Sequence, residues 1–464
     1  MKNIKNNIIC ISGPSGVGKT TIAKLLTCIL EQEAIVISGD DSHKWSRKSK
    51  NWEKYTHLDP SANNLEEEKE QLNNLKNNIK IKRRHYNHNT GLFDPIKEIS
   101  PAQNIIYEGL HTLYDEQFRN LCDIGIYVDT DEELKIAWKL KRDLKERGYT
   151  KKQVYEAIKK RTDDEKKYIL PQKKHADIVI KFSFSESGVK MKYKTKSDKH
   201  NDMLEKLSLL YEEKKKFVDI CHRVSKESSL VQNSGGNISV KFNGNLLITS
   251  SGCRLSKVGI LKNCCFVKKT NGNIIGETKP SMEMGSHIHL NKSVIHTHPV
   301  NLLAILCSME AKEIINKIYK DYKFEFLDYI TPGKEVENCV AKRNKKSNVL
   351  FLKNHGLFVT SSSLESCLQI TKEINSLATE YLKNNKKEEM NKNSHKALGH
   401  LFPDSVVLPK INEQINNEIY KMIIESGLTP CFLTKEDQAI LLNLEEEKYR
   451  IKMESKNEDN LCRH

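Results

Sequence analysis

The sequence predicts an α/β protein with two domains, the first of which has a mostly parallel sheet. Two observations support this prediction. Short apolar runs alternate with helical stretches over residues 8–180, a pattern typical of parallel α/β sheets. The chain has 464 residues, which is more than one hydrophobic core usually serves.

The first domain is expected over residues 1–182. Its first strand, Ile8–Ile11, leads into a Gly-rich turn and then into a helical pattern over Thr20–Leu30. The further strand candidates, each separated by helical stretches, are Ala34–Ile37, Asn104–Tyr107, Gly125–Val128 and Asp177–Ile180.

A linker is expected over residues 183–203, because the sequence from Phe182 to His200 is polar and basic and lacks helical periodicity. The second domain, expected over residues 204–464, opens with a helix over Asn201–Lys226. Short strands such as Val349–Leu352 follow, separated by turns rich in Gly, Asn and Ser, so this domain is also predicted to be α/β. Two helical stretches, Glu413–Ser426 and Gln438–Met453, predict a C-terminal helical extension.

The composition narrows the class of protein. The chain has no apolar run of about 18 residues and no signal-peptide pattern, so we expect a cytoplasmic protein without a membrane partner. Its twelve cysteines are scattered without a C-x-x-C pair and are expected to be reduced thiols. The net charge of +15 is spread along the chain. This distribution favours a general bias in amino-acid composition, or binding of phosphorylated substrates, over nucleic-acid binding.

A phosphate-binding loop follows the first strand. Residues 13–20 read GPSGVGKT and fit the pattern G-x-x-x-x-G-K-[ST] between a strand and a helix, and a chance match is the alternative. Backbone N–H groups of such a loop cradle phosphate oxygens, Lys19 can reach the β- and γ-phosphates, and Thr20 can hold Mg²⁺. The motif indicates nucleotide binding but does not separate a kinase from an ATPase or a GTPase. The expected nucleotide-binding residues here are Gly13, Gly16, Gly18, Lys19, Thr20 and Thr21.

Carboxylates follow two of the later strands. Asp40 and Asp41 come after Ala34–Ile37, where a carboxylate can accept the proton of an attacking hydroxyl. Glu108 follows Asn104–Tyr107 and is placed to orient Mg²⁺ or its water. Each acid taken alone can equally be a solvated loop charge or a helix cap. Their order after the phosphate-binding loop favours a kinase.

Residues 8–181 resemble the phosphoribulokinase family, especially the form found in oxygenic phototrophs. The matching stretches are THLDPSANN (56–64), YNHNTGLFDP (86–95), EGLHTLYDE (108–116), AWKLKRDLKERG (137–148) and PQKKHADIVI (171–180). The resemblance implies a kinase that uses ATP and Mg²⁺. It does not carry over thiol regulation, because the loop lacks the cysteine of light-regulated relatives.

The same resemblance implies roles for individual residues. It places the catalytic base on Asp40, contacts to the sugar and its phosphate on His43, Arg47 and Arg147, and the lid on Lys139, Arg142 and Asp143. Arg forks suit phosphate oxygens, and a closing Arg/Lys lid can stabilise the transferred phosphoryl group. The segment after Asp41 is shorter and differently charged than in the family, so the implied acceptor is a sugar or sugar phosphate without further identity.

Three histidines indicate a metal site in the second domain. His296 and His298 are two residues apart at the end of an apolar strand, so their side chains leave the same face and can grip one metal. His355 follows another strand. Three imidazoles with an open position describe a catalytic zinc site, whereas each histidine alone can equally be a satisfied core or surface residue.

Residues 204–410 resemble the class II aldolase/adducin family. The matching stretches, all in family order, are GGNIS (235–239), ITSSG (248–252), KPSME (279–283), HTHP (296–299) and NHG (354–356). Two further stretches, HLFPDSVVL (400–408) and EEEKYR (445–450), resemble the tail of longer sugar aldolases. Relatives in this family form tetramers, so a homo-oligomer is implied.

By this resemblance, Zn²⁺ is held by His296, His298 and His355, and Glu283 is the acid/base beside it. The residues implied to bind substrate phosphate are Gly236, Asn237, Ser250, Ser251, Gly252 and Ser281. Zinc polarises a carbonyl and stabilises an enediolate while a carboxylate moves the proton. Met282 stands where many aldolases have a second serine, so the phosphate pocket is expected to differ in shape.

These observations predict a bifunctional carbohydrate enzyme that acts on small sugar phosphates and not on nucleic acid. The front domain would phosphorylate a sugar or sugar phosphate, and the rear domain would cleave a phosphorylated ketose. The alternatives for the rear domain are a sugar-phosphate epimerase or a decarboxylase. In the family that this domain resembles, the epimerases tend to have Asp at the position of Glu283, so the resemblance implies carbon–carbon cleavage or decarboxylation over epimerisation. A further alternative is that one half is a non-catalytic scaffold.

Overall fold

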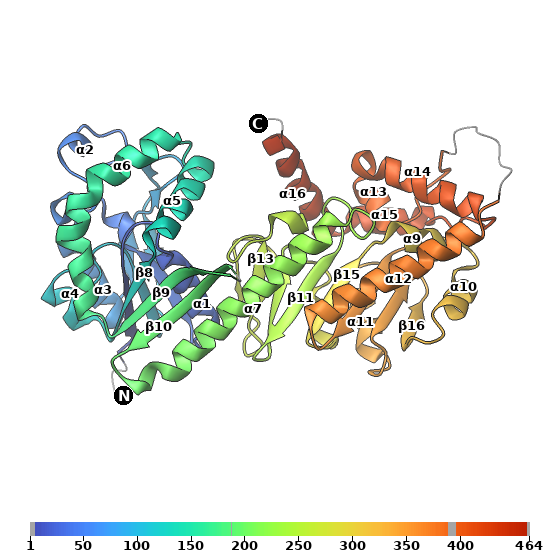
Figure 1. Ribbon diagram of the computed structural model, residues 1–464, viewed down its shortest axis with the longest axis horizontal. Helices are drawn as coiled ribbons and strands as arrows, with labels where there is room; N and C mark the ends of the chain where they lie inside the picture. The colour runs from blue at the N-terminus through green and yellow to red at the C-terminus, as the bar shows by residue number, and fades with distance from the viewer. Residues whose placement is uncertain (1–4, 187, 388–395, 462–464) are drawn as a thin grey trace. The chain divides into compact units, whose positions relative to one another are not determined.

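The computed structural model describes residues 5–186, 188–387 and 396–461 (Figure 1). The chain divides into two compact units, Met1–Glu212 and Glu213–His464, which are described separately below. Within the described ranges, none of the helices combines the length and the apolar character that crossing a membrane requires.

The first unit is built on a six-stranded sheet in the order β10-β9-β8-β1-β7-β2. Its strands are β1 (Asn7–Ser12), β2 (Ala34–Ser38), β7 (Asn104–Glu108), β8 (Ile124–Thr130), β9 (Ile178–Ser185) and β10 (Gly188–Thr195). All neighbours pair parallel except β9 and β10, which pair antiparallel. The predicted mostly parallel sheet is therefore confirmed.

Helices and two small ribbons surround this sheet. The helices are α1 (Lys19–Ile29), α2 (Asn51–Lys54), α3 (Leu65–Lys76), α4 (Glu116–Leu121), α5 (Glu132–Glu146) and α6 (Lys151–Asp164). The ribbons pair β3 (Ile81–Arg83) with β6 (Lys97–Ile99), and β4 (Tyr86–Asn87) with β5 (Leu92–Phe93). Strand β1 lies between β7 and β8, and its residues Ile8, Ile9 and Ile11 are all buried. Parallel strands covered on both faces need such continuous apolar runs.

The segment 183–203 differs from the expected linker. The end of β9, strand β10 and the start of α7 (Asn201–Lys226) occupy it. Phe182 and Met191 are buried, whereas Lys190 and Lys192 are exposed. A strand at the edge of a sheet with one face in water alternates in this way, and its polar residues give the segment the composition of a loop. Helix α7 has the predicted bounds and crosses the border between the two units.

The second unit is built on an eight-stranded sheet in the order β14-β13-β12-β11-β15-β18-β17-β16. Its strands are β11 (Asn237–Phe242), β12 (Asn245–Thr249), β13 (Cys264–Val267), β14 (Ile274–Ile275), β15 (Ser293–Thr297), β16 (Phe324–Leu327), β17 (Val349–Leu352) and β18 (Gly356–Ser361). Among these strands, β16 and β17 pair parallel and the other neighbours pair antiparallel. The neighbouring interior strands β15 and β18 carry or adjoin the histidines of the predicted metal site.

The helices of the second unit cover this sheet and form its C-terminal part. They are α8 (Met284–His289), α9 (Val300–Leu306), α10 (Ala311–Ile318), α11 (Lys334–Lys342), α12 (Leu364–Asn384), α13 (Pro403–Val407), α14 (Pro409–Glu425), α15 (Lys435–Asn443) and α16 (Glu445–Leu461). Figure 1 shows α12 running across the sheet, where it packs on β15 and β18.

The C-terminal extension is helical as predicted, but the stretch Gln438–Met453 forms parts of two helices. The break lies at Leu444, where φ is −65° and ψ is 126°, which is outside the helical region. Helix α16 then begins with Glu445, Glu446 and Glu447, and acidic side chains in a first turn favour a helix N-terminus.

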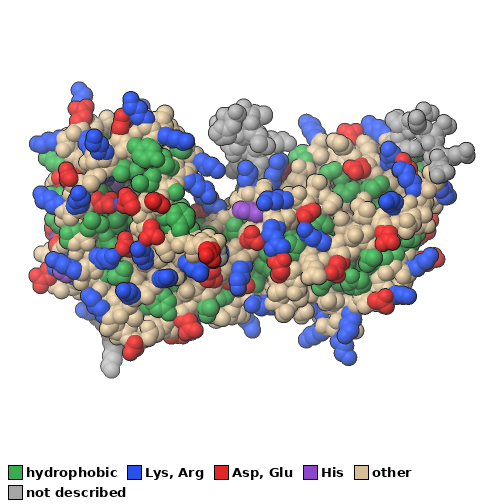
Figure 2. Space-filling view, in the orientation of Figure 1, with side chains coloured by type: hydrophobic (Ala, Val, Ile, Leu, Met, Phe, Trp, Pro, Cys, Tyr) green, Lys and Arg blue, Asp and Glu red, His purple; other side chains and the backbone are tan. Residues whose placement is uncertain are grey.

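Figure 2 shows how charge is distributed over one face of the molecule. Lys and Arg side chains are interspersed there with Asp and Glu side chains. The positive charge is therefore spread over this face and is not gathered in one stripe.

Two candidate active sites

The phosphate-binding loop joins β1 to α1. Gly16 and Gly18 adopt left-handed φ values of 89° and 97°. Lys19 Nζ donates hydrogen bonds to the carbonyl oxygens of Gly13 and Pro14, each at 2.9 Å. Burial lowers the pKa of Lys19, and the nearby Glu108 opposes this effect. The loop thus places the ammonium group of Lys19 beside the N-terminus of α1, where phosphate oxygens bind.

Thr20 and Glu108 form an oxygen pair beside this loop. Thr20 Oγ1 donates a hydrogen bond to Glu108 Oε1 at 3.1 Å. Glu108 ends β7 and is buried, and burial raises the pKa of its carboxyl group against the charge of Lys19. Hydroxyl and carboxylate oxygens are the ligands that Mg²⁺ prefers. The donor set therefore fits the Mg²⁺ that was predicted here.

The two neighbouring acids Asp40 and Asp41 have different surroundings in the turn Gly39–Ser42. The Asp41 side chain is 9% exposed, lies 3.2 Å from Arg83 Nε, and accepts the backbone N–H of Tyr86 at 2.8 Å. The Asp40 side chain is 34% exposed and faces a pocket that Lys19 also lines. Asp41 is thus engaged in holding the structure, whereas Asp40 is open to a substrate.

The charge of Asp40 is stabilised by its neighbours. Its Oδ2 lies 3.1 Å from Nε2 of His88. Burial would raise the pKa of Asp40, but the His88 hydrogen bond and the charges of His43, His88 and Lys19 hold it well below the ordinary value. A carboxylate that stays ionised can accept a proton.

One pocket collects the side chains predicted for phosphoryl transfer and for sugar-phosphate contact. They are Lys19, Asp40, His43, Arg47, Glu108, Lys139, Arg142 and Arg147, together with Gly16. The remaining predicted residues, Gly13, Gly18, Thr20 and Thr21, lie in the same loop and in the first turn of α1. Residues far apart in the sequence therefore share one cavity.

The predicted lid residues meet around one carboxylate in α5. Asp143 lies 3.3 Å from Lys139 Nζ, 2.9 Å from Arg142 Nε and 3.5 Å from Arg147 Nη1. Burial lowers the pKa of Lys139 to about 8, and the charge of Arg161 adds to this. One carboxylate thus contacts three basic side chains beside the pocket. Because three positive charges face one negative charge, the excess positive charge favours binding of phosphate oxygens.

Several residues of this pocket were not singled out from the sequence, among them His88 and Arg161. His88 accepts a hydrogen bond at Nδ1 from Arg147 Nη2 at 3.2 Å, so its Nε2 carries the proton that faces Asp40. Arg161 of α6 lines the same pocket. His88 lies within the stretch 86–95 that carries the resemblance, which is a signal that could have found it. Arg161 lies in an ordinary charged helix, and nothing in its local sequence marks it.

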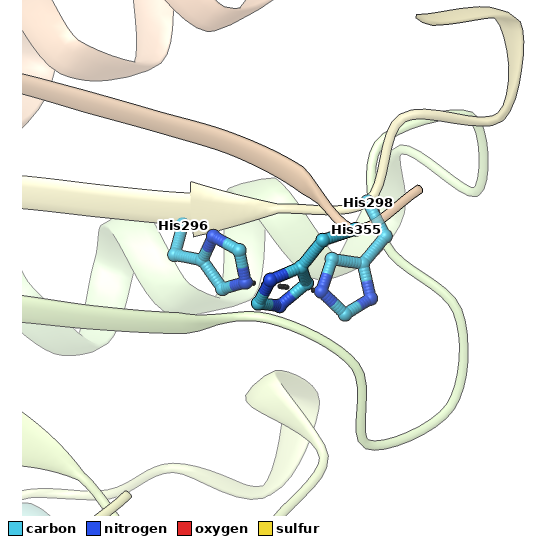
Figure 3. A group of neighbouring side chains, drawn as sticks. All are labelled: His296, His298 and His355. Atoms are coloured by element: carbon cyan, nitrogen blue, oxygen red, sulfur yellow. Dashed lines mark hydrogen bonds between the residues drawn. The ribbon is translucent and has the colours of Figure 1, made fainter. Parts of the chain in front are cut away.

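The second unit brings the three predicted metal ligands together. Their nearest ligand nitrogens lie within 4.8 Å of one another, and all three side chains are buried. Figure 3 shows His296 on β15, His298 just beyond the end of that strand, and His355 facing them from another segment. His355 lies in the turn between β17 and β18. A Cβ at Gly356 would lie 2.6 Å from Thr297 O, so the N-H-G sequence allows this turn to approach β15.

The hydrogen bonds of two histidines fit a bound cation. Nδ1 of His296 lies 3.0 Å from the carbonyl oxygen of Leu357, and Nδ1 of His298 lies 3.0 Å from Asp404 Oδ2. Both partners only accept, so both Nδ1 atoms carry the proton. The two Nε2 atoms lie 3.0 Å apart, each with a lone pair. Two facing acceptors are stabilised by a cation between them, so the donor set fits zinc.

Glu283 lies against this group. Its Oε2 is 3.2 Å from His296 Nε2, and its Oε1 is 3.3 Å from His355 Nε2. Asn237 Nδ2 donates a hydrogen bond to Oε2 at 2.6 Å, and Oδ1 of Asn237 contacts the ring of His287. The Asn237 side chain is therefore engaged in orienting Glu283. Its predicted contact with substrate phosphate stays a prediction.

The predicted phosphate-binding residues line one pocket together with residues of the predicted metal site. They are Gly236, Asn237, Ser250, Ser251, Gly252 and Ser281, and the pocket is shared by Glu283, His298 and His355. Among the further lining residues that were not singled out, three are charged: Asp404, Glu447 and Arg450. They belong to the stretches 400–408 and 445–450, whose resemblance to sugar-aldolase tails gave the only signal of their place.

Each of the two units matches a known protein family. The Phosphoribulokinase / Uridine kinase family matches residues 8–186, and the Class II Aldolase and Adducin N-terminal domain matches residues 215–382. The chain is 43% identical over 174 residues to phosphoribulokinase of Synechocystis sp.. The aligned region covers 37% of this chain and 52% of that protein. It is 35% identical over 184 residues to uridine kinase of Lactobacillus helveticus, covering 37% of this chain and 85% of that protein.

Two solved structures resemble the second unit. Sugar-phosphate aldolase from Thermotoga maritima is 18% identical, with a TM-score of 0.33, and the match covers 40% of this chain and 98% of that one. The l-fuculose-1-phosphate aldolase from Thermus thermophilus is 20% identical, with a TM-score of 0.31, covering 38% of this chain and 93% of that one.

The fold and the phosphate-binding loop define the first unit as a P-loop kinase of α/β type, and the second unit as a class II aldolase-like α/β domain. Through residues 8–186 the chain belongs to the phosphoribulokinase/uridine kinase family. It spans about half the length of the curated phosphoribulokinases that it matches.

Proposed function

We propose that the chain is a bifunctional carbohydrate enzyme. Its first unit transfers a phosphoryl group from ATP, held with Mg²⁺, to a sugar or sugar phosphate, and its second unit cleaves a phosphorylated ketose with the help of zinc. The observation that carries the proposal is the content of the two pockets. The first pocket contains the phosphate-binding loop and the open carboxylate of Asp40. The second is lined by Glu283, several serines, and two of the three clustered histidines, His298 and His355.

In the first pocket, the positions of the side chains support a role for each in phosphoryl transfer. Asp40 is open and ionised, so it accepts the proton of the attacking hydroxyl. Arg47 and Arg147 line the same pocket, and their guanidinium groups can bind an anionic acceptor. Lys139 and Arg142 stabilise the charge on the transferred phosphoryl group.

In the second pocket, Zn²⁺ held by the three histidines would polarise the ketose carbonyl and stabilise an enediolate. Glu283, oriented by Asn237, moves the proton at the carbon that gains or loses it. The hydroxyls of Ser250, Ser251 and Ser281 bind the phosphate of the substrate. Phosphorylation by the first unit would supply the anionic group that this pocket binds.

One screen tests both activities. The protein is incubated with free and phosphorylated ketoses, with and without ATP, and the products are read by mass. A gain of one phosphoryl group only with ATP supports the first unit, and two shorter fragments support the second. An unchanged mass with a new isomer would replace cleavage by epimerisation, and loss of carbon dioxide would replace it by decarboxylation. A half that changes no compound would support a scaffold role for that half.

We also propose that the second unit assembles into a tetramer and binds one zinc ion per chain. Both rest on the likeness to class II aldolases and on the histidine geometry above. Native mass spectrometry with metal analysis tests them together. A monomer would contradict the proposed tetramer, and a protein that binds no metal would contradict the zinc assignment.

A further inference from the structure

The last helix of the chain packs against the loop that carries the predicted phosphate-binding serines. A Cβ at Gly252 would lie 2.9 Å from Met453 Cβ and 3.4 Å from Arg450 Cα. Arg254 Nη2 lies 2.6 Å from Glu454 Oε1. Gly252 also adopts a φ of 69°, which favours glycine. The loop and α16 are therefore in direct contact, and α16 forms one wall of the second pocket.

Two charged side chains of α16 reach this pocket, and they differ in their partners. Arg450 Nη1 lies 2.7 Å from Asp404 Oδ1 and 3.6 Å from Glu447 Oε2. Glu447 is 1% exposed, and its Oε2 atom makes no hydrogen bond. The Arg450 charge is thus engaged chiefly with Asp404. Glu447 remains as a buried carboxyl group that lines the pocket and has one oxygen without a hydrogen bond.

A buried carboxyl group without a hydrogen bond is costly in its ionised form. Burial raises the pKa of Glu447, Asp404 and Glu283 raise it further, and Arg450 and His355 oppose them. These groups come from α13, from the segment before α8, from α16 itself and from the turn after β17. The balance lets Glu447 hold a proton at a higher pH than an ordinary glutamate does.

We propose that Glu447 is a second catalytic residue of the rear site and moves the proton of the substrate hydroxyl, while Glu283 moves the proton at carbon. This inference rests on the proposed carbon–carbon cleavage. That reaction needs two proton transfers at different atoms, and the pocket offers two carboxyl groups on different elements.

The step balances in both directions. In cleavage, the O–H bond of the hydroxyl two carbons from the ketose carbonyl breaks, and its proton passes to the Glu447 carboxylate. The carbon–carbon bond breaks, an aldehyde forms, and the electron pair of the bond becomes the enediolate. A proton from Glu283 then completes the shorter ketose, and the proton taken up by Glu447 returns through water to Glu283, which restores both groups. In condensation, protonated Glu447 gives its proton to the aldehyde oxygen as the new bond forms.

Two reactions of the same site separate the two carboxyl groups. Dihydroxyacetone phosphate in D₂O exchanges a carbon-bound hydrogen, which needs proton transfer at carbon only. Condensation of the same probe with glycolaldehyde needs both transfers. Glu447→Gln is expected to keep zinc and the exchange rate but to lose condensation by on the order of 100-fold or more. Glu283→Gln is expected to lose both reactions.

The controls make the outcome decisive. Glu446→Gln changes an exposed neighbour on the same helix and should behave as the wild type. Glu447→Asp keeps a carboxyl group and should recover part of the condensation rate. Full condensation by Glu447→Gln, or an equal loss of exchange and condensation, would overturn the role of Glu447. A zinc-loaded wild type that carries out neither reaction would overturn the proposed cleavage as well, so the two failures are distinguishable.

Discussion

Oδ2 of Asp404 lies 3.0 Å from Nδ1 of His298, although 106 residues separate them in the chain. The hydrogen bond fixes the protonated nitrogen of His298 and leaves Nε2 free to bind a metal. Arg450, at 2.7 Å from the other carboxylate oxygen, fixes Asp404 in turn. Helix α16 is therefore linked to a predicted metal ligand through two contacts.

Asp404→Asn should weaken zinc binding without removing a ligand. Asparagine keeps an acceptor for His298 but loses the charge that orients the ring and raises its basicity, so zinc affinity is expected to fall roughly 10- to 100-fold. Competition with a chelator measures this, and Asp321→Asn at an exposed position is the matched control. Unchanged affinity in Asp404→Asn would show that the contact does not support the metal.

Glu283→Gln should keep zinc and lose turnover, whereas His298→Ala should lose both. A ligand substitution removes the metal, but an acid/base substitution leaves the metal without a proton partner. Metal analysis of each purified variant beside its cleavage rate makes the comparison. If Glu283→Gln loses zinc as fully as His298→Ala, Glu283 is primarily a ligand. If it keeps zinc and full activity, the proton moves through another group.

Asp40→Asn and Lys19→Ala should each abolish phosphoryl transfer and leave the chemistry of the second unit intact. Losing a general base typically costs on the order of 100- to 10,000-fold in rate. ATP consumption with an active acceptor measures this loss. Near wild-type transfer by Asp40→Asn would contradict the assignment of the base.

Asp41→Asn provides the contrast to Asp40→Asn. Asp41 and Arg83 are both buried, and removing one partner of such a pair typically destabilises a protein by about 3 kcal/mol or more. We therefore expect a lower free energy of unfolding, measured with denaturant on the full chain. An Asp41→Asn variant of wild-type stability with abolished transfer would exchange the roles of the two acids.

The kinase reaction should lose rate on the alkaline side because of Lys139. Burial lowers the pKa of Lys139 to about 8, so it is charged below that pH and loses its positive charge as the pH rises through it. We expect kcat/KM to fall above a pH of about 8, since this parameter reports on the free enzyme. Lys139→Arg should move the fall to higher pH, because arginine stays protonated. Lys141→Arg, exposed on the same helix, is the control, and an identical profile in all three proteins would exclude Lys139 as the cause.

Much of the fold followed from local patterns. Strands β1, β7, β8 and β17 lie where short apolar runs predicted them, because a buried strand needs consecutive apolar side chains. The edge strand β2 also lies on a predicted apolar run, although Val36 is exposed. Helix α7 has its predicted bounds. The strand predicted over Asp177–Ile180 lies at the start of β9. The rest of β9 and all of β10 were missed, because many of their residues face water and resemble those of a loop.

The sequence by itself determined which residues are candidates for chemistry. The phosphate-binding loop and the three histidines could be named because each motif is short and its spacing alone has a geometric meaning. Their grouping into two pockets agrees with that interpretation.

Only the tertiary structure decided which candidates are free to act. Asp41 pairs with Arg83, whereas Asp40 stays open to the pocket. The Asn237 side chain contacts Glu283, and Glu447 of the last helix lies in the same pocket as His298 and His355. These outcomes depend on contacts between residues far apart in the chain. Such contacts are set by how helices and strands pack, and a local pattern does not contain that information.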